Sequence, residues 1–289
     1  QRQMCIRDRD LRVNRLRASP AQVQQDLAAA GISTESIVGC PDGLRISGHS
    51  GDLRHWPGYA EGHWCVQDCS AQWIAPLLEP QPGDRILDAC AAPGGKATHL
   101  AELVGDQAEI WAVDRSAGRL KRVAANAARL GLASINALAA DAANLLEQRP
   151  QWRESFQRIL IDAPCSGLGT LARHPDARWR VTPQSIRGLL PQQQALLDGL
   201  LPLLAPQGVL VYATCTIHPD ENQKQIQALL KRHSALRLEQ ESQRWTHQAS
   251  GEMGSIRLCC RGFRTLDQSR VQRRPWRSTL LPGELSLQR

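Results

Sequence analysis

Two cysteines and one aspartate stand where the sequence predicts that two neighbouring strands end. The segment "DAPCSGLGT" (162–170) carries Asp162 and Cys165, and "ATCT" (213–216) carries Cys215 after the apolar run "GVLVY". A single cysteine at a strand end is often just a small buried side chain. Two of them at one edge of a parallel sheet would face a common cleft, where a thiolate acts as a nucleophile. The pair is therefore our candidate for covalent chemistry.

The reaction that suits such a thiol is methylation of carbon 5 of cytosine. That carbon is a poor nucleophile, and a thiolate that adds to carbon 6 makes it enamine-like. A carboxyl group beside ring N3 and the amino group stabilises the adduct, and Asp162 is expected to supply it. Lys96 and the helix that begins after Pro93 favour the thiolate by their positive potential. A second thiol can then assist release of the product.

A Gly-rich segment, "DACAAPGGKATHL" (88–100), lies where a predicted strand turns into a helix. Gly94 and Gly95 allow a ligand to approach the backbone closely, and the first helical amides can bind an anion. The spacing matches neither the dinucleotide pattern nor the P-loop, which favours a nucleoside that carries a carboxylate. Asp114 and Asp141 follow the next two strands and are expected to hold ribose and adenine. Alternatively, each caps the helix that follows it.

Strands and helices alternate between about residues 69 and 249. The expected strands are 85–90, 109–114, 135–141, 158–164 and 208–215, and the expected helices are 95–104, 116–130, 187–204 and 219–232. Apolar strands separated by helices predict a parallel α/β sheet covered on both faces. Residues 10–68 are expected to form a small α+β module. In it, a helix begins after Ser19 and ends at Gly31, between two short strands.

The composition is that of a globular protein that can bind nucleic acid. The net charge is +7 and the isoelectric point about 9.1, with 42% hydrophobic and 22% charged residues. A basic excess attracts phosphates. No apolar run approaches the roughly 20 residues of a membrane span, and no leader segment is recognisable, so we expect no membrane contact and a cytoplasmic location. Cys65 and Cys69 lack a second pair at zinc spacing, so no metal site is expected.

Together these segments resemble the RNA cytosine-5 methyltransferase superfamily, with the closest match to the bacterial 16S rRNA cytosine-5 methyltransferase B family of the Fmu/Sun type. The resemblance is carried by "VQDCSAQ" (66–72), "LDACAAPGGKATHL" (87–100), "AVDRSAGRLKRVAANAARLG" (112–131), "ILIDAPCSGLGTLARHPDARW" (159–179) and "LVYATCTIHPDENQ" (210–223). It implies a Rossmann-like S-adenosylmethionine-dependent methyltransferase sheet.

The resemblance also assigns roles to residues. Cys215 would be the nucleophile and Cys165 the helper in product release, with Asp162 and Lys96 completing the catalytic set. The residues implied to contact S-adenosylmethionine are Cys90, Ala91, Ala92, Pro93, Gly94, Gly95, Lys96, Asp114, Asp141 and Asp162. The run 173–179 matches a pattern near the substrate, "RRHPDxxW", with Ala172 in place of the first arginine.

The implied substrate is one cytosine of 16S rRNA, methylated on free RNA before subunit assembly by a monomer. The module at 10–68 would be an RNA-binding linker. Family members carry an additional N-terminal helical RNA-binding domain, so we expect this chain to be truncated at its N-terminus. Residues 1–9 are expected to be unstructured or foreign.

The tail from residue 250 to 289 shows no helical or strand period and is expected to be irregular. "GEMGSIR" (251–257) stands where the family begins its closing strand near "GDGFF", and shifted codons can restore that sequence. We therefore hypothesise a slip of the reading frame just before Gly251, which an uninterrupted frame in the source DNA would contradict. Without a closing strand, 208–215 would be an exposed apolar edge, and the chain poorly soluble or weakly active.

Three other interpretations remain open. A DNA cytosine-5 methyltransferase would use Cys165 as the nucleophile, but such enzymes lack "ATCT". A catalytically impaired RNA-binding protein on the same fold would have no need for Cys165, Cys215 and Asp162 together. A small-molecule methyltransferase would leave the paired cysteines without a role.

Overall fold

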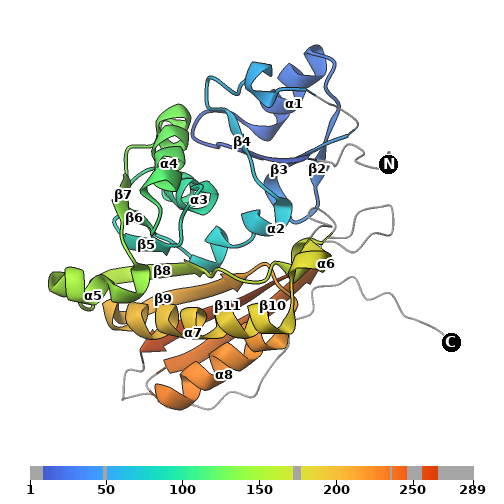
Figure 1. Ribbon diagram of the computed structural model, residues 1–289. Coiled ribbons are helices and arrows are strands. Elements are labelled where there is room, and N and C mark those ends of the chain that lie inside the picture. Colours follow the sequence, from blue (N-terminus) through green and yellow to red (C-terminus); the bar gives the residue numbers. More distant parts are fainter. Residues whose placement is uncertain (1–8, 48–50, 172–176, 235, 246–255, 266–289) are drawn as a thin grey trace.

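The computed structural model describes residues 9–47, 51–171, 177–234, 236–245 and 256–265 (Figure 1). The strands are β1 (Arg9–Val13), β2 (Thr34–Ile37), β3 (Cys40–Ile46), β4 (Trp64–Val66), β5 (Arg85–Ala89), β6 (Glu109–Asp114), β7 (Ile135–Ala139), β8 (Phe156–Asp162), β9 (Leu204–Thr214), β10 (Leu236–Trp245) and β11 (Ile256–Thr265). The helices are α1 (Pro20–Ala29), α2 (Cys69–Gln72), α3 (Gly95–Leu103), α4 (Ala117–Leu130), α5 (Leu145–Gln148), α6 (Ala177–Arg180), α7 (Pro183–Leu200) and α8 (Gln223–Arg232).

The large sheet has the strand order β10–β11–β9–β8–β5–β6–β7. Its five strands from β9 to β7 are parallel. They are the five strands predicted from the apolar runs, and the four predicted helices are α3, α4, α7 and α8. The expected Rossmann-like α/β fold with a small α+β module is thus confirmed.

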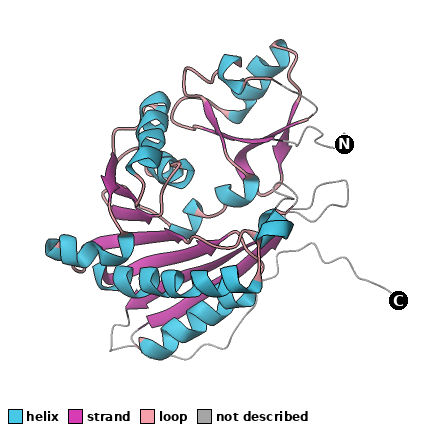
Figure 2. Ribbon diagram, viewed as in Figure 1, coloured by secondary structure: helices cyan, strands magenta, loops and turns pink. Residues whose placement is uncertain are grey.

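The core lies on both faces of this sheet, as expected for buried parallel strands. Successive residues of one strand belong to different clusters: Leu87 packs with α7 and α8, and its neighbour Ile86 packs with α3 and α4. The same alternation recurs along β8, where Ile159 and Leu160 lie in opposite clusters. The helices form a layer on each side of the sheet (Figure 2). Both layers hold the carboxyl ends of β8 and β9 in place.

The small sheet is antiparallel, with the order β2–β3–β1–β4. Helix α1 begins as predicted: Ser19 is its N-cap and accepts a hydrogen bond from Gln22 N, and Gly31 follows it with φ of +78°. Strands β2 and β4 were not predicted because they are only four and three residues long, too short for an alternating pattern to be read.

The expectation that residues 250–289 are irregular is wrong for Ile256–Thr265, which forms β11. This strand pairs antiparallel with β9 from Leu258 opposite Thr214 to Arg261 opposite Val211, and with β10 on its other side. The strand that leads to Cys215 is therefore not an edge. The hydrogen bonds between paired strands join backbone groups, so this segment can pair with β9 although its side chains gave no clear strand pattern. Gly251 lies outside the described residues, and the frame-slip hypothesis stays a prediction.

Among the described residues, no helix is both long enough and apolar enough to span a membrane. Residues 1–8 are outside the described part of the chain, so the expectation of a foreign N-terminal edge also stays a prediction.

Candidate active site

A pocket of about 210 Å³ opens at the carboxyl ends of β5 and β8. The sequence-predicted residues that line it are Cys90, Ala91, Ala92, Pro93, Gly95, Lys96 and Asp162. The remaining lining residues, Val66, Gln67, Asp68, Ala71 and Asp88, were not predicted as site residues. Four of these five lie in "VQDCSAQ", which the sequence marks only through its resemblance. The pocket is thus built from the large sheet and from the segment that leaves the small module.

The Gly-rich turn is shaped to expose backbone to a ligand. Gly94 is the N-cap of α3 with φ of +105°, and a Cβ there would lie 3.0 Å from Cα of Val123 in α4. Only glycine allows this conformation and this close approach. No side chain caps α3, and its first turn holds no acidic residue. The amide of Ala97 faces Asp88, and the amides of Gly95 and Lys96 at the helix start suit the carboxylate of a bound ligand.

Asp114 ends β6 and Asp141 precedes a short 3₁₀ helix, but neither is among the residues that line the pocket. Asp114 accepts hydrogen bonds from Ser116 N at 2.9 Å and Ala92 N at 3.3 Å, so it holds the Gly-rich turn. Asp141 caps the 3₁₀ helix Ala142–Asn144 and accepts from Arg115 at 2.8 Å. The capping alternative therefore holds for Asp141, whereas the N-cap of α4 is Ser116.

Asp88 is the buried acid of the pocket, and the sequence analysis missed it. It lies at the end of β5 with no exposed surface. Burial raises the pKa of Asp88 to about 8, and the charges of Asp162 and Asp114 add to the rise, while Lys96 opposes it. Its position at the start of the Gly-rich segment 88–100 and near the end of a buried strand was the signal that could have identified it.

Lys96 and Asp162 form an ion pair across the pocket, with Nζ 2.5 Å from Oδ2. Lys96 comes from the first turn of α3 and Asp162 from the end of β8, which are far apart in the sequence. The lysine side chain is mostly buried, and about a third of the aspartate side chain is exposed. The structure thus brings together two of the four predicted catalytic residues at the pocket.

The other two, Cys165 and Cys215, lie directly beside one another. Their sulfur atoms are 3.3 Å apart, and the backbone N–H of Cys215 also donates to Cys165 Sγ at 3.3 Å. The parallel pairing of β8 with β9 explains this, because Asp162 is opposite Ala213 and both cysteines follow within three residues. Neither cysteine lines the pocket itself.

The two thiols are not equivalent. The hydrogen bond to Cys215 raises the pKa of Cys165 well above its ordinary value, and burial and the charge of Cys215 raise it further. The raised pKa favours the protonated thiol at Cys165, and either sulfur of the pair can donate the hydrogen bond. The nucleophilic form of a cysteine is the thiolate, and a neighbouring thiol can stabilise a thiolate by donating a hydrogen bond to it.

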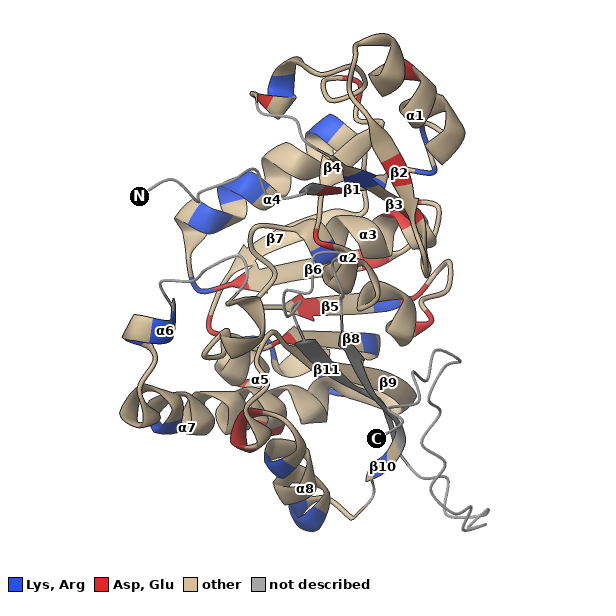
Figure 3. Cartoon of the chain, turned by 90° about the vertical axis from the view of Figure 1, so that its right-hand side faces the viewer, with Lys and Arg blue, Asp and Glu red and all other residues tan. Residues whose placement is uncertain are grey.

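Part of the predicted substrate segment lies outside the described residues, namely 172–176. Helix α6 follows it directly and exposes Trp179 to 83%. Arg178 and Arg180 are also exposed, as are basic residues along α4, including Lys121 and Arg122 (Figure 3). Exposed aromatic and basic side chains of this kind suit stacking with bases and contact with phosphates.

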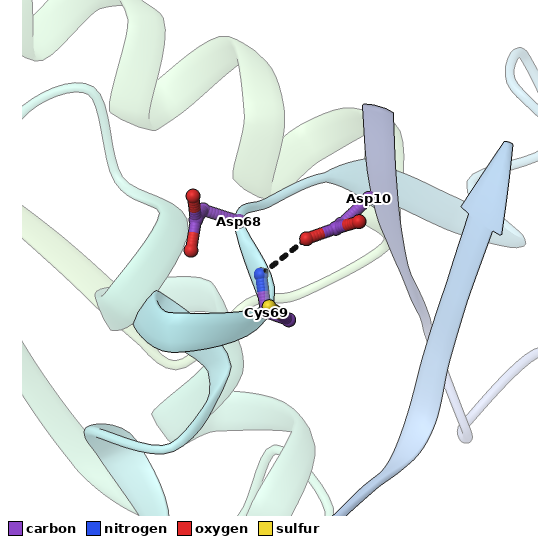
Figure 4. A group of neighbouring side chains, drawn as sticks. All are labelled: Asp10, Asp68 and Cys69. Carbon is purple, nitrogen blue, oxygen red and sulfur yellow. Dashed lines mark hydrogen bonds between the residues drawn. The ribbon is translucent and has the colours of Figure 1, made fainter. Parts of the chain in front are cut away.

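A separate group, Asp10, Asp68 and Cys69, has the ligand types of a metal site (Figure 4). Asp10 already accepts hydrogen bonds from Arg45 Nε at 3.0 Å and Cys69 N at 2.8 Å, and Asp68 accepts from Ser70 N at 2.6 Å. Burial raises the pKa of the Cys69 thiol, and the two carboxylates add to the rise. A metal would bind the thiolate form of Cys69, which the raised pKa disfavours. We therefore interpret these hydrogen bonds as the contacts that hold β1 against α2.

Comparison with known proteins identifies the family of this chain. The family model described as 16S rRNA methyltransferase RsmB/F matches residues 75–264. A probable ribosomal RNA small subunit methyltransferase B from Synechocystis sp. is 50% identical over 80% of this chain and 51% of that protein. The ribosomal RNA small subunit methyltransferase B of Pseudomonas syringae pv. tomato is 44% identical over 78% of this chain and 50% of that protein. The chain thus spans about half the length of the curated relatives it matches.

Solved structures share the fold over nearly the whole chain. The crystal structure of PH0851 superposes with a TM-score of 0.83 at 29% identity, covering 90% of this chain and 60% of that chain. A methyltransferase homolog protein from Pyrococcus horikoshii gives a TM-score of 0.75 at 26% identity, covering 89% and 87%. The chain therefore belongs to the 16S rRNA methyltransferase RsmB/F family, whose methyl donor is S-adenosylmethionine.

Proposed function

We propose that this chain methylates carbon 5 of a cytosine in 16S rRNA, with Cys215 as the nucleophile and Cys165 as the residue that assists release. The observation that carries the proposal is the pair of sulfur atoms, 3.3 Å apart, at the ends of the neighbouring strands β8 and β9. As further proposals, the substrate is free rRNA, the enzyme acts as a monomer, and the reaction takes place in the cytoplasm.

The pocket residues hold the methyl donor. The uncapped start of α3 binds its carboxylate, and Asp114 and Asp141 are proposed to hold the ribose and the adenine. Gly94 allows the backbone to approach closely. When bound, S-adenosylmethionine supplies a methyl group on a positively charged sulfur. Lys96 orients Asp162 through their ion pair.

The covalent step begins at Cys215. Its thiolate adds to carbon 6 of the cytosine and forms a carbon–sulfur bond, and the electron pair of the 5,6 double bond becomes available at carbon 5. The Asp162 carboxylate accepts a hydrogen bond from the amino group of the base, and the charge of its ion-pair partner Lys96 opposes the negative charge that develops on the ring. Carbon 5 takes the methyl group. Cys165, having released its own proton to solvent once the adduct has formed, accepts the hydrogen of carbon 5 as a proton. The electron pair of that carbon–hydrogen bond restores the 5,6 double bond, and Cys215 leaves as a thiolate.

Adduct formation changes the state of Cys165. A sulfur that is bonded to carbon 6 carries no negative charge and is a weak hydrogen-bond acceptor. The largest cause of the raised pKa of Cys165 is its hydrogen bond to Cys215, so the pKa falls once the base is attached. Cys165 thus becomes available for proton transfer only when release is the next step.

Exposed side chains suit the RNA. Lys121 and Arg122 on α4 and Arg178 and Arg180 on α6 can neutralise phosphates, and Trp179 can stack on a base (Figure 3). The role of the module at 10–68 as an RNA-binding linker remains part of this proposal.

The test is transfer of a labelled methyl group to 16S rRNA made by transcription. We expect Cys215→Ala to abolish transfer, and Cys165→Ala to accumulate a covalent protein–RNA adduct that survives denaturing electrophoresis. Transfer by Cys215→Ala together with loss in Cys165→Ala would reverse the roles, as in a DNA cytosine-5 methyltransferase. No transfer by the unchanged chain would support the interpretation as an impaired RNA-binding protein.

A further inference from the structure

We propose that two consecutive buried residues, Glu221 and Asn222, are positioning residues that set the spacing of Cys165 and Cys215, one residue for each cysteine. Both lie where a 3₁₀ helix (Pro219–Glu221) meets α8, and they are 0% and 2% exposed. This inference rests on the proposed function, because it assigns each cysteine a separate step.

Glu221 holds the loop that carries Cys165. Its carboxylate accepts hydrogen bonds from the backbone N–H of Ser166 at 2.8 Å, from the Ser166 hydroxyl at 2.5 Å and from Gln193 Nε2 at 3.0 Å. Gln193 of α7, itself fully buried, also donates to the carbonyl of Pro164 at 3.0 Å. The residues directly before and after Cys165 are therefore both fixed by the same network.

Asn222 holds the loop that carries Cys215 in the same way. Its Oδ1 accepts from the Thr214 hydroxyl at 2.5 Å, and its Nδ2 donates to the carbonyl of Thr216 at 3.0 Å. Thr214 and Thr216 are both fully buried and flank Cys215 in the sequence. The backbone of Glu221 is anchored in turn, because its carbonyl accepts from the Tyr212 hydroxyl at 2.8 Å.

One hydrogen bond joins the two loops directly. The hydroxyls of Ser166 and Thr216 are 2.8 Å apart. Since the Ser166 hydroxyl gives its proton to Glu221, its oxygen must accept from Thr216. Glu221 thus fixes the direction of the bond that holds the residues after both cysteines together. A buried carboxylate with satisfied acceptors is a rigid support of this kind.

This arrangement predicts different failures for the two residues. Loosening the Cys165 loop leaves attack by Cys215 intact but slows release, so the covalent adduct accumulates. Loosening the Cys215 loop slows attack, so turnover falls without adduct. A residue that only stabilised the fold would slow both steps together and would not separate them.

The experiment compares four variants in single-turnover and steady-state assays with labelled S-adenosylmethionine and transcribed 16S rRNA. Glu221→Gln and Gln193→Leu weaken the Cys165 side, because Gln193 bonds Pro164 and Glu221. Asn222→Ala and Thr214→Val weaken the Cys215 side. The second variant of each pair is the milder one and keeps the test possible if the first does not fold. Asp198→Asn is the matched control. It weakens the contact between α7 and α8 in which Arg232 donates to Asp198 at 2.9 Å, and this contact does not involve the cysteine loops.

We expect kcat to fall about tenfold or more in all four variants, since small displacements of a reacting group have effects of this size. The adduct should accumulate only in Glu221→Gln and Gln193→Leu. Cofactor affinity should be unchanged in all four variants, and the Asp198→Asn control should behave as the unchanged chain. Equal adduct levels in both pairs, unchanged kcat, or a parallel loss of cofactor affinity would each overturn the inference. Failure of the proposed function is a distinct result: Cys215→Ala would then still transfer the methyl group.

Discussion

The buried ion pair between Arg12 of β1 and Glu102 of α3 joins the small module to the cofactor pocket. Arg12 is fully buried and donates to Glu102 Oε1 at 2.7 Å and Oε2 at 3.0 Å. It also donates to the carbonyl of Gly95 at 2.7 Å and to the side chains of Gln67 and Thr98. Arg12→Met keeps much of the volume but leaves the Glu102 carboxylate buried without its partner.

Removing one partner of such a pair costs about 3–5 kcal/mol, because the remaining charge is uncompensated. Glu102 is almost as buried as its partner, with a side chain that is 5% exposed, so we expect the full range here. Gly95 and Gln67 line the pocket, so the same change should weaken S-adenosylmethionine binding. The double variant Arg12→Met, Glu102→Leu removes both charges and should recover most of the lost stability.

The loss should depend on pH with a defined sign. Burial already raises the pKa of Glu102, and Arg12 opposes that rise. Without Arg12, the folded-state pKa moves further above the unfolded value of about 4.3. Folding then takes up a proton, so stability is retained at low pH and is lost as pH rises through the folded pKa. The deficit of Arg12→Met should therefore be larger at pH 7 than at pH 5.

Urea unfolding at both pH values measures these differences. The single variant is compared with the wild type and with the double variant. A loss below about 1 kcal/mol for Arg12→Met, the size expected of a surface pair, would refute the reasoning. A double variant no more stable than the single one would do the same.

Three further predictions concern the pocket. Burial raises the pKa of Asp88 to about 8, so the wild type loses stability as pH rises from 4 to 8 and this carboxyl group ionises. Asp88→Asn cannot ionise, so its thermal stability relative to the wild type should increase over this interval; an equal difference at pH 4 and pH 8 would contradict the prediction. Gly94→Ala should lower the free energy of unfolding by about 1–3 kcal/mol because of its φ of +105°, whereas Gly95→Ala, whose Cβ would be 3.5 Å from Gln67 Nε2, serves as the control. Lys96→Met should abolish methyl transfer while changing the unfolding free energy by less than about 1 kcal/mol, since Asp162 is partly exposed; a fully active variant would exclude a role for this pair.

The sequence allowed the neighbouring positions of Cys165 and Cys215 to be predicted, because parallel strands end at one edge of the sheet and the order of strands follows from the helices between them. It also allowed most of the pocket wall to be predicted, because the Gly-rich turn is contiguous. These are consequences of local pattern and topology, which a single sequence carries.

The parts that were missed depend on packing between distant segments. Gln67 lies at the pocket where Arg12 joins it to the carbonyl of Gly95 at the start of α3. Asp88 looks like an ordinary strand residue until the helix above it is in place. Residues Glu221 and Asn222 follow Cys215 closely, but nothing in the spacing indicates that one of them supports the other cysteine loop. Such links between loops need coordinates.

Strand β11 gives Cys215 a second support, and its removal makes a final prediction. The pairing of β11 with β9 reaches Thr214, the residue directly before Cys215. A chain that ends at residue 250 would leave β9 as an apolar edge, and such edges pair with other molecules. A chain that ends at residue 265 keeps β11 and is the matched control.

We expect the shorter chain to aggregate and to lose methyl transfer about tenfold or more, while the part of it that remains monomeric still binds S-adenosylmethionine, since no residue of β9 or β11 lines the pocket. Size-exclusion chromatography and cofactor titration measure both properties. If the two chains were equally monomeric and equally active, the support of Cys215 would have to come from the Asn222 side alone, and pairing along the sheet would contribute nothing to catalysis.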